Sequence, residues 1–258
     1  MNTLSIDNIY NAPVYHFDIC ESTMTEARVL AKNGAVNGTV ALAEYQNAGR
    51  GRLGERRWNV GKGEGLLFTI ILRYVSFSDI PRAVTLRAGL AAALALEELY
   101  PPLAPFITVK WPNDIMLDGK KLCGILTESD GSTVYIGIGI NVYQREFPPE
   151  LNAVSIAMAM SAGKKPLNGG NNQFNGKIDN ERRLLLETVL RRLHNVLKDD
   201  TDWRIGIEER LYKKGIYVQF MQGDGAVCGL LLGVDTDGAL LIGTGGEAKR
   251  FVSGELVK

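Results

Sequence analysis

An arginine- and glycine-rich loop gives the clearest chemical signal in this 258-residue sequence. The loop follows an apolar run at residues 40–43, and its glycines alternate with arginines. Glycine lets a backbone approach a ligand and adopt positive φ, and arginine offers a planar fork of donors that suits phosphate and carboxylate. The loop is therefore expected to fold over an anion. Its residues are Glu44, Tyr45, Gln46, Asn47, Ala48, Gly49, Arg50, Gly51, Arg52, Leu53 and Gly54, followed by Glu55, Arg56, Arg57 and Trp58.

Two other interpretations of this loop compete with anion binding. The simplest is a solvated basic turn, since short motifs also occur by chance. Residues 49–54 also spell G-x-G-x-x-G, but the dinucleotide fingerprint needs a helix at its end and an acidic residue about 20 positions further on. More loop follows here, so we reject that interpretation. The Walker A pattern occurs nowhere in the sequence.

Three further polar segments lie where predicted strands end or begin. Taken singly, each has a purely structural explanation. Ser22-Thr23 would cap a helix, Trp111 would be a core aromatic before a turn, and Lys121 would be an exposed strand end. The glycines would allow close packing between strands. Taken together with the arginine loop, they supply hydroxyls, an amide, an aromatic face, positive charge and a glycine-lined strand. That set suits a nucleotide plus a small acid with a polar head. The segments are Glu21-Ser22-Thr23, Lys110-Trp111-Pro112-Asn113-Asp114 with Lys120-Lys121, and Gly137-Ile138-Gly139-Ile140-Asn141.

Composition limits the possible classes of protein. With 29 basic and 29 acidic residues, nothing draws the whole chain toward nucleic acid or an anionic membrane. The three cysteines are widely spaced and odd in number, which indicates reduced thiols and a cytoplasmic protein. Two distant histidines predict no His/Cys metal site. We find no signal peptide and no apolar run of about 18 residues that could span a membrane.

Hydrophobic periodicity predicts an alternation of strands and helices. The first helix should begin at Ser22-Thr23, with Glu26 closing a capping box from Thr23, and end at Asn33-Gly34. Four arginines of the helix at 181–198 are expected to face water, namely Arg182, Arg183, Arg191 and Arg192. The remaining helices are expected at 81–99, with a proline in its first turn, and at 150–162. Strands are expected at 39–45, 65–73, 106–111, 121–129 and 133–142.

The last part of the chain has a different pattern. Four short apolar runs from about residue 215 onward are separated by Gly/Asp-rich turns, which predicts a small antiparallel barrel or sheet of about 45 residues. Between the two parts, residues 163–180 are rich in Lys, Gly and Asn and are expected to form a passive loop or bridge.

These motifs, in this order, resemble those of the biotin–protein ligase family. The arginine loop and Lys-Trp-Pro-Asn-Asp are the most specific, and the resemblance covers nearly the whole chain. It implies an α+β fold, with a mixed β-sheet catalytic domain flanked by helices, as in class II aminoacyl-tRNA synthetases, at residues 1–213. A small C-terminal SH3-like β-barrel would occupy residues 214–258. The matching segments are residues 21–23, 44–52, 110–114, 121–128, 137–142, 147–148, 153–156 and 253–256.

The resemblance implies a two-step reaction. The carboxylate of biotin attacks the α-phosphorus of Mg-ATP, giving biotinyl-5′-adenylate and pyrophosphate. A lysine of a biotin carboxyl carrier domain then attacks the adenylate and releases AMP. Mg²⁺ would be bound through the phosphates, and no metal is expected on protein ligands. Some family members form dimers by sheet extension, so a homodimer is one possible assembly.

The same resemblance assigns roles to individual residues. Lys121 and Arg52 would neutralise the two anions, and Asp114 would organise Lys121 or lie near the acceptor lysine. Trp111 would stack on adenine. The residues expected to bind biotin are Ser22, Thr23, Gln46, Gly49, Arg50, Gly51, Arg52, Lys121 and Gly137. Those expected to bind ATP are Arg52, Trp111, Asn113, Lys121 and Asn141.

The sequence departs from the family pattern at two places, and three alternatives remain open. Met24 stands where the family often has Asn, and one extra residue lies between Gly54 and Trp58. Lipoate ligases share the fold, but they carry an Arg-Arg and Gly-Gly-Gly run that this chain lacks. A bifunctional ligase–repressor needs a helix-turn-helix, and only about 20 residues without a helical pair precede Glu21, so no operator binding is expected. A non-catalytic biotin-binding module would not need Lys121 and the loop arginines.

Overall fold

The computed structural model describes residues 1–52, 57–162, 178–198, 203–223 and 225–257. The tip of the arginine loop and residues 163–177 lie outside these ranges. Predictions made for Gly54, for Arg56, for the extra residue before Trp58 and for the Lys/Gly/Asn-rich segment therefore fall outside the described residues.

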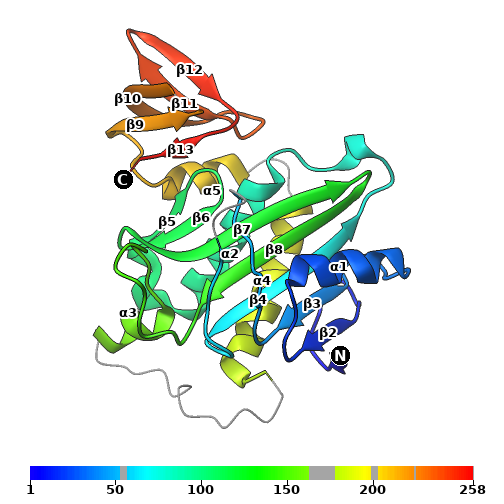
Figure 1. Ribbon diagram of the computed structural model, residues 1–258. Coiled ribbons are helices and arrows are strands. Elements are labelled where there is room, and N and C mark those ends of the chain that lie inside the picture. The colour runs from blue at the N-terminus through cyan, green and yellow to red at the C-terminus, as the bar shows by residue number, and fades with distance from the viewer. Residues whose placement is uncertain (53–56, 163–177, 199–202, 224, 258) are drawn as a thin grey trace.

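An eight-stranded mixed sheet forms the larger part of the molecule (Figure 1). Its strand order is β1-β2-β3-β4-β8-β7-β6-β5, and only the β2–β3 pair is parallel. The strands are β1 (Asn2–Leu4), β2 (Val14–Phe17), β3 (Val40–Ala43), β4 (Gly65–Arg73), β5 (Ile107–Lys110), β6 (Asp114–Leu117), β7 (Lys120–Asp130) and β8 (Thr133–Asn141).

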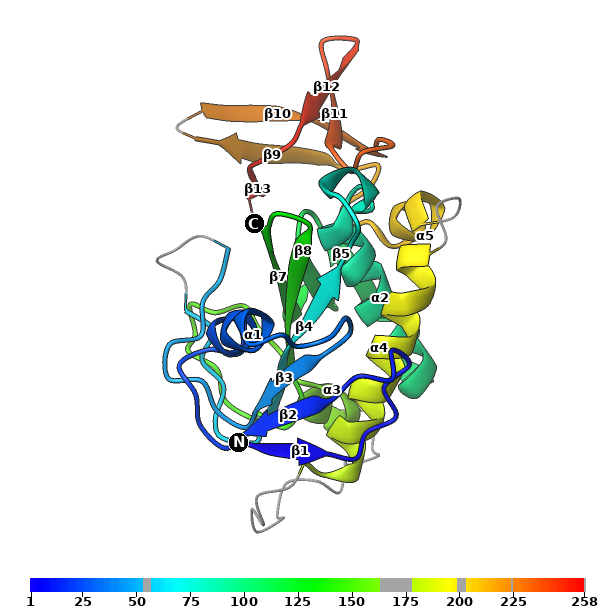
Figure 2. The same cartoon turned by 90° about the vertical axis from the view of Figure 1, so that its right-hand side faces the viewer.

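Helices cover both faces of this sheet (Figure 2). One face carries α1 (Thr23–Lys32), and the other carries α2 (Val84–Leu99), α4 (Asn180–Lys198) and α5 (Trp203–Arg210). The first eight residues of β4 are all buried, which confirms the prediction of a strand covered on both sides. The expected α+β architecture is thus present.

The start of α1 differs in detail from the prediction. Its N-cap is Ser22, whose hydroxyl accepts a hydrogen bond from the backbone N–H of Thr25. Thr23 lies inside the helix, and its hydroxyl donates to the side chain of Gln46 instead. The capping box expected between Thr23 and Glu26 was therefore wrong, because the site uses that hydroxyl.

Two helix predictions were also too long. The N-cap of α2 is Ala83 in a left-handed conformation (φ 54°), so Pro81 precedes the helix. The helix α3 covers only Ile156–Ala162. The backbone before α3 pairs with the start of β7, where Lys121 N–H donates to Asn152 O at 2.8 Å and Val154 N–H donates to Lys121 O at 3.0 Å. A helix over the same residues would remove those bonds.

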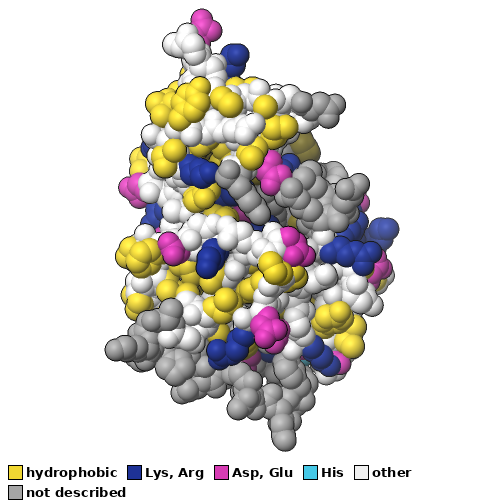
Figure 3. Space-filling view, turned by 60° about the vertical axis from the view of Figure 1, so that its left-hand side comes forward, with side chains coloured by type: hydrophobic (Ala, Val, Ile, Leu, Met, Phe, Trp, Pro, Cys, Tyr) yellow, Lys and Arg dark blue, Asp and Glu magenta, His cyan; other side chains and the backbone are white. Residues whose placement is uncertain are grey.

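The expectation that four arginines of α4 face water was wrong for Arg182. Only 3% of its side chain is exposed, and its guanidinium bonds Glu44 and Asp179. Arg183 and Arg191 are exposed as expected, and Arg192 is one-third exposed. Figure 3 shows basic and acidic side chains interspersed on one face, as the balanced composition predicts.

A second sheet of five antiparallel strands packs at one end of the larger sheet (Figure 1). Phe220 and Phe251 are buried on its inner face, and Phe220 contacts Trp111 of the larger domain. The SH3-like closure of this sheet stays a prediction. No described helix is both long and apolar enough to cross a bilayer. The strands are β9 (Tyr217–Gln222), β10 (Gly225–Val234), β11 (Leu240–Thr244), β12 (Glu247–Phe251) and β13 (Glu255–Leu256), in the order β12-β11-β10-β9-β13.

Candidate active site

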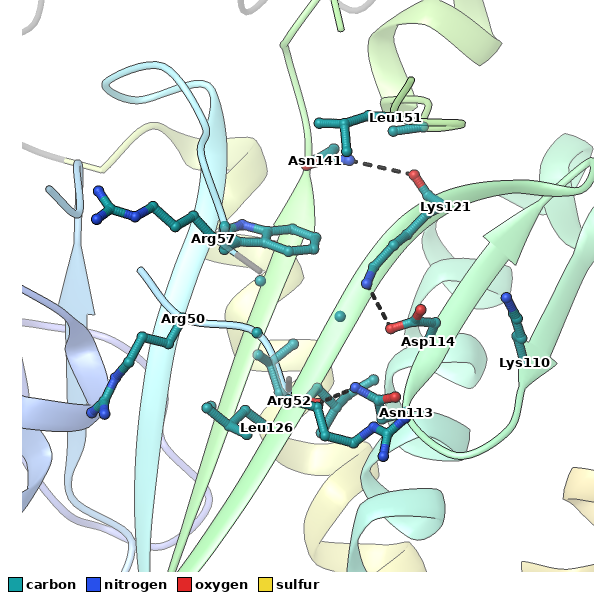
Figure 4. Close-up of a pocket in the computed structure, with 18 of the residues that line it drawn as sticks. Arg50, Arg52, Arg57, Lys110, Asn113, Asp114, Lys121, Leu126, Asn141 and Leu151 are labelled. Carbon is teal, nitrogen blue, oxygen red and sulfur yellow. Dashed lines mark hydrogen bonds and ion pairs between the residues drawn. The ribbon is translucent and has the colours of Figure 1, made fainter. Parts of the chain in front are cut away.

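A cavity of about 660 Å³ brings the predicted polar segments together (Figure 4). It lies over β4, β7 and β8, between the arginine loop on one side and the β5–β6 turn on the other. Residues 137, 139 and 141 of β8 share one face of the strand because side chains alternate. The cavity can therefore be followed along β8 from Gly137 to Asn141, a length of about 13 Å at 3.3–3.4 Å per residue.

Hydroxyl and amide groups form a connected network at the Gly137 end. Gln46 Oε1 accepts hydrogen bonds from Thr23 N–H at 2.7 Å and from Thr23 Oγ1 at 3.1 Å. Thr69 Oγ1 in turn donates to Thr23 Oγ1 at 2.9 Å. Thr69 is fully buried and pairs with Gly137 across β4 and β8. Thr69 is not among the predicted site residues, because one hydroxyl within a nearly continuous apolar run gives no sign of its function.

Glycines in the middle of the cavity leave room for Trp58. A Cβ atom at Gly139 would lie 2.7 Å from two atoms of the indole, and one at Gly124 would lie 2.9 Å from it. Lys121 Nζ lies 5.4 Å from the centre of the Trp58 ring. The indole thus forms a flat wall over the glycine-lined strands. Trp58 is not among the residues predicted to bind biotin or ATP, although its position at the end of the arginine loop could have suggested a role.

Lysines and a carboxylate lie beside these glycines. Lys121 Nζ and Asp114 Oδ1 form an ion pair at 2.8 Å, and the lysine side chain is 35% exposed (Figure 4). Lys110 also lines the cavity. Burial lowers the pKa of Lys110, against the opposing effect of Glu255 and Asp114. Two lysine side chains therefore lie near Asp114 in this part of the cavity.

Two asparagines use the NH₂ group of the side-chain amide for hydrogen bonds within the protein. Asn113 Nδ2 donates to Ile125 O at 2.9 Å. Asn141 Nδ2 donates to Val154 O at 3.1 Å and faces Lys121 O at 3.4 Å (Figure 4). Each leaves its Oδ1 to accept hydrogen bonds from a ligand.

The described part of the arginine loop is a narrow hairpin. Trp58 N–H donates to Gly49 O at 3.0 Å, and Arg50 pairs with Arg57 across the hairpin. Arg52 Nη2 donates to Gly254 O in the second sheet at 2.9 Å. All three arginines line the cavity, but Figure 4 shows the guanidinium groups of Arg50 and Arg57 pointing away from Lys121. Their contact with an anion remains a prediction.

Trp111 lines the cavity and also packs between the two sheets. It is 3% exposed, its Nε1–H donates to Gly238 O at 2.9 Å, and its ring packs against Phe220. The expected stacking of Trp111 on adenine stays a prediction. Cys123 is fully buried, and burial raises the pKa of its thiol, which suits a packing role and not a reactive thiol.

The side chains of the described residues suit a metal ion that arrives bound to the nucleotide better than one that the protein itself holds. Those residues contain no cluster of three or more His, Cys, Asp or Glu side chains that could hold an ion. Asp114 is already paired with Lys121. A divalent ion would therefore be held mainly by phosphate oxygens, as Mg²⁺ commonly is.

The fold and cavity define a class of protein. It is an α+β protein with a site for an acid that has a polar head, next to a site for an anionic nucleotide. Residues 17–142 match the biotin/lipoate A/B protein ligase family.

Individual relatives narrow that class. The bifunctional ligase/repressor BirA of Bacillus subtilis is 34% identical over 251 residues, which cover 94% of this chain and 73% of that protein. The biotin–[acetyl-CoA-carboxylase] ligase of Mycobacterium tuberculosis is 36% identical over 148 residues, 54% of this chain and 53% of its own length. The biotin protein ligase of Aquifex aeolicus in complex with biotin and ATP has a TM-score of 0.74 at 29% identity, covering 95% of this chain and 97% of the other. The chain belongs to the biotin protein ligase family.

Proposed function

We propose that this protein is an ATP-dependent biotin–protein ligase. It activates biotin as biotinyl-5′-adenylate and then transfers it to a lysine of a biotin carboxyl carrier domain. The observation that carries the proposal is the order of groups along one cavity. The Thr23–Gln46–Thr69 network lies at one end, the Lys121 ammonium group lies beside Trp58 and the glycines in the middle, and Asn141 lies at the other end.

The polar network suits the ureido head of biotin. A buried ureido group loses its bonds to water and must recover them from protein donors and acceptors. Gln46 offers its amide N–H groups there, since its Oε1 is occupied by Thr23. Ser22, Gly49, Gly51 and Arg50 would complete the contacts around the head, and the apolar body of biotin would lie between the glycines and Trp58.

The part of the cavity around the Lys121 ammonium group suits the joining of two anions. A carboxylate oxygen attacks the α-phosphorus, and pyrophosphate leaves with the bonding electron pair. Lys121 would contact both reacting groups and reduce their repulsion, and Arg52 would add charge from the loop. Asp114 holds the Lys121 ammonium group in place before the substrates bind. Mg²⁺, bound through the phosphates, would neutralise further charge on the leaving group.

The nucleotide is expected beside Asn141 and Asn113. Leu151 lies close to Asn141 (Figure 4), and Phe147 also lines the cavity, so both offer an apolar surface for the base. In the second step, the neutral amine of the carrier lysine attacks the acyl carbon and AMP departs. Closure of the cavity around the adenylate would limit its loss to water.

The direct test is to incubate the protein with labelled biotin, ATP and an apo carrier domain. We expect pyrophosphate release and label on the carrier. Omitting the carrier should leave biotinyl-adenylate bound to the protein. Absence of both adenylate and labelled carrier would refute the proposal. Substituting lipoate for biotin in the same assay addresses the related ligase activity, and we expect no transfer.

A further inference from the structure

A buried ionic cluster lies behind the cavity and takes no part in the chemistry above. It consists of Arg182 in α4, Glu44 just after β3 and Asp179 just before α4. Their side chains are 3%, 1% and 16% exposed. None of the three lines the cavity.

One guanidinium group touches three backbone segments. Arg182 Nη1 donates to Glu44 Oε2 at 2.7 Å and to the carbonyl oxygen of Gly65 at 3.2 Å. Arg182 Nε donates to Asp179 Oδ2 at 2.5 Å. The other oxygen of Glu44 bonds His16 Nε2 at 2.8 Å, so the carboxylate is held from both sides. Burial opposes ionisation of Glu44, but His16 and Arg182 together hold its pKa below the ordinary value.

These segments lead to both ends of the cavity. Glu44 is two residues before Gln46 in the chain. Gly65 pairs with Asn141 across β4 and β8. Asp179 accepts a hydrogen bond at 2.8 Å from the hydroxyl of Tyr143, which is two residues beyond Asn141. The biotin end and the nucleotide end are thus both connected to Arg182.

Stability alone is a weak explanation for such a cluster. Buried ion pairs lose much of their attraction to the cost of desolvation, and apolar replacements of similar volume are often equally stable. What an apolar residue cannot supply is direction, since the guanidinium group presents its donors in a rigid planar fork. A fork of this kind fixes the distances between the groups that it bonds.

We propose that Arg182 is a positioning residue that fixes Gln46 and Asn141 relative to each other. The biotin and nucleotide sites would then keep the separation that in-line attack requires. This inference rests on the proposed function and assigns that site a residue that does not touch the ligand.

The test uses two variants and a matched control. Tyr143→Phe removes only the hydroxyl that joins the Asn141 segment to Asp179. Because a hydrogen bond to a charged group is worth about tenfold or more in an equilibrium, we expect KM for ATP to rise about tenfold and KM for biotin to change less than about twofold. Arg182→Lys keeps the charge but loses the fork, and both KM values should rise. Arg183→Lys is the control, since Arg183 is 46% exposed on the same helix and bonds Glu187; its KM values should stay unchanged.

The outcomes distinguish failure of the proposed function from failure of the positioning role. If the unmodified protein forms no adenylate, the proposed function fails and the positioning role is void with it. If the unmodified protein is active, a Tyr143→Phe variant with unchanged KM for ATP overturns the positioning role. A Tyr143→Phe variant in which both KM values rise equally overturns it as well. The thermal unfolding transition of each variant is measured first, and its assays are run below that temperature. Tyr143→Phe decides the question even if Arg182→Lys fails to fold.

Discussion

Replacing Lys121 with methionine tests the charge argument behind the proposed chemistry. Methionine keeps an unbranched side chain of similar length and removes the ammonium group. In the absence of substrates that group lies 2.8 Å from Asp114 Oδ1 and is partly exposed. With both substrates bound, it would face a carboxylate and an α-phosphate at once.

The expected loss follows from the distances and the exposure. Two unit charges about 4 Å apart interact by about 4 kcal/mol at an effective dielectric constant of about 20. Exposure of Lys121 and the loss of its hydration lower the net gain, and removal of one such group typically costs about 2.7–4 kcal/mol of transition-state stabilisation. We therefore expect Lys121→Met to form biotinyl-adenylate about 10²- to 10³-fold more slowly.

The assay should separate the two steps of the reaction. Pyrophosphate release in a single turnover reports adenylation, and transfer from preformed biotinyl-adenylate to the carrier reports the second step. Lys120→Met is the control, because Lys120 neighbours Lys121 on β7 but is exposed and lies outside the cavity. Adenylation by Lys121→Met within about threefold of the unmodified rate would refute the reasoning.

Four further predictions follow from the same geometry. Thr69→Val keeps the shape of the side chain but removes the donor to Thr23, so KM for biotin should rise about fivefold with kcat unchanged. If Thr69 only fills space, steady-state kinetics would show an unchanged KM for biotin. Gly139→Ala puts a methyl group 2.7 Å from the indole of Trp58 and should weaken biotin binding about tenfold, measured by calorimetry. An analogue with a protonated imino group in place of the ureido carbonyl should compete poorly with biotin, because Gln46 offers donors; strong competition would contradict the assigned amide orientation. Because the pKa values of Glu44 and Asp179 are lowered in the folded protein, both groups stabilise the fold at pH values above their ordinary pKa values of 4.5 and 3.8. That stabilisation is lost as the pH falls through the lower pKa values of the folded state. Urea denaturation at neutral and acid pH should show the free energy of unfolding decrease.

Local sequence patterns predicted most of the elements that build the site. The continuous apolar run of β4 and the hydroxyl and glycine signals around α1 gave nearly correct boundaries. The strand β6 was missed, because its four residues follow Pro112 too closely to show a period of their own. Local signals thus located the loops that meet at the cavity, and the resemblance to a family supplied their expected roles.

Side-chain environments were less predictable, because they depend on contacts between distant segments. Arg182 occupies a helix position beside other arginines, and nothing local shows that Glu44 lies opposite it, 138 residues away. Trp111 directly follows β5, and the partner of its indole N–H is the carbonyl oxygen of Gly238, 127 residues away. Thr69 is useful only because Thr23 of α1 comes within 2.9 Å of it. In each case the deciding partner is remote in sequence.

The amide groups around the cavity fix the direction in which a ligand can bind. Gln46 Oε1 receives the backbone N–H of Thr23, which can only donate, so the free side of that amide must be its NH₂ group. Asn113 and Asn141 donate to backbone carbonyl oxygens, which can only accept, so their free sides must be oxygens. The Gln46 end therefore requires an acceptor such as a ureido carbonyl, and the Asn141 end requires donors such as nucleotide hydroxyl or amino groups. Because these orientations exist before any ligand binds, the protein has already met part of the entropic cost of ordering the site.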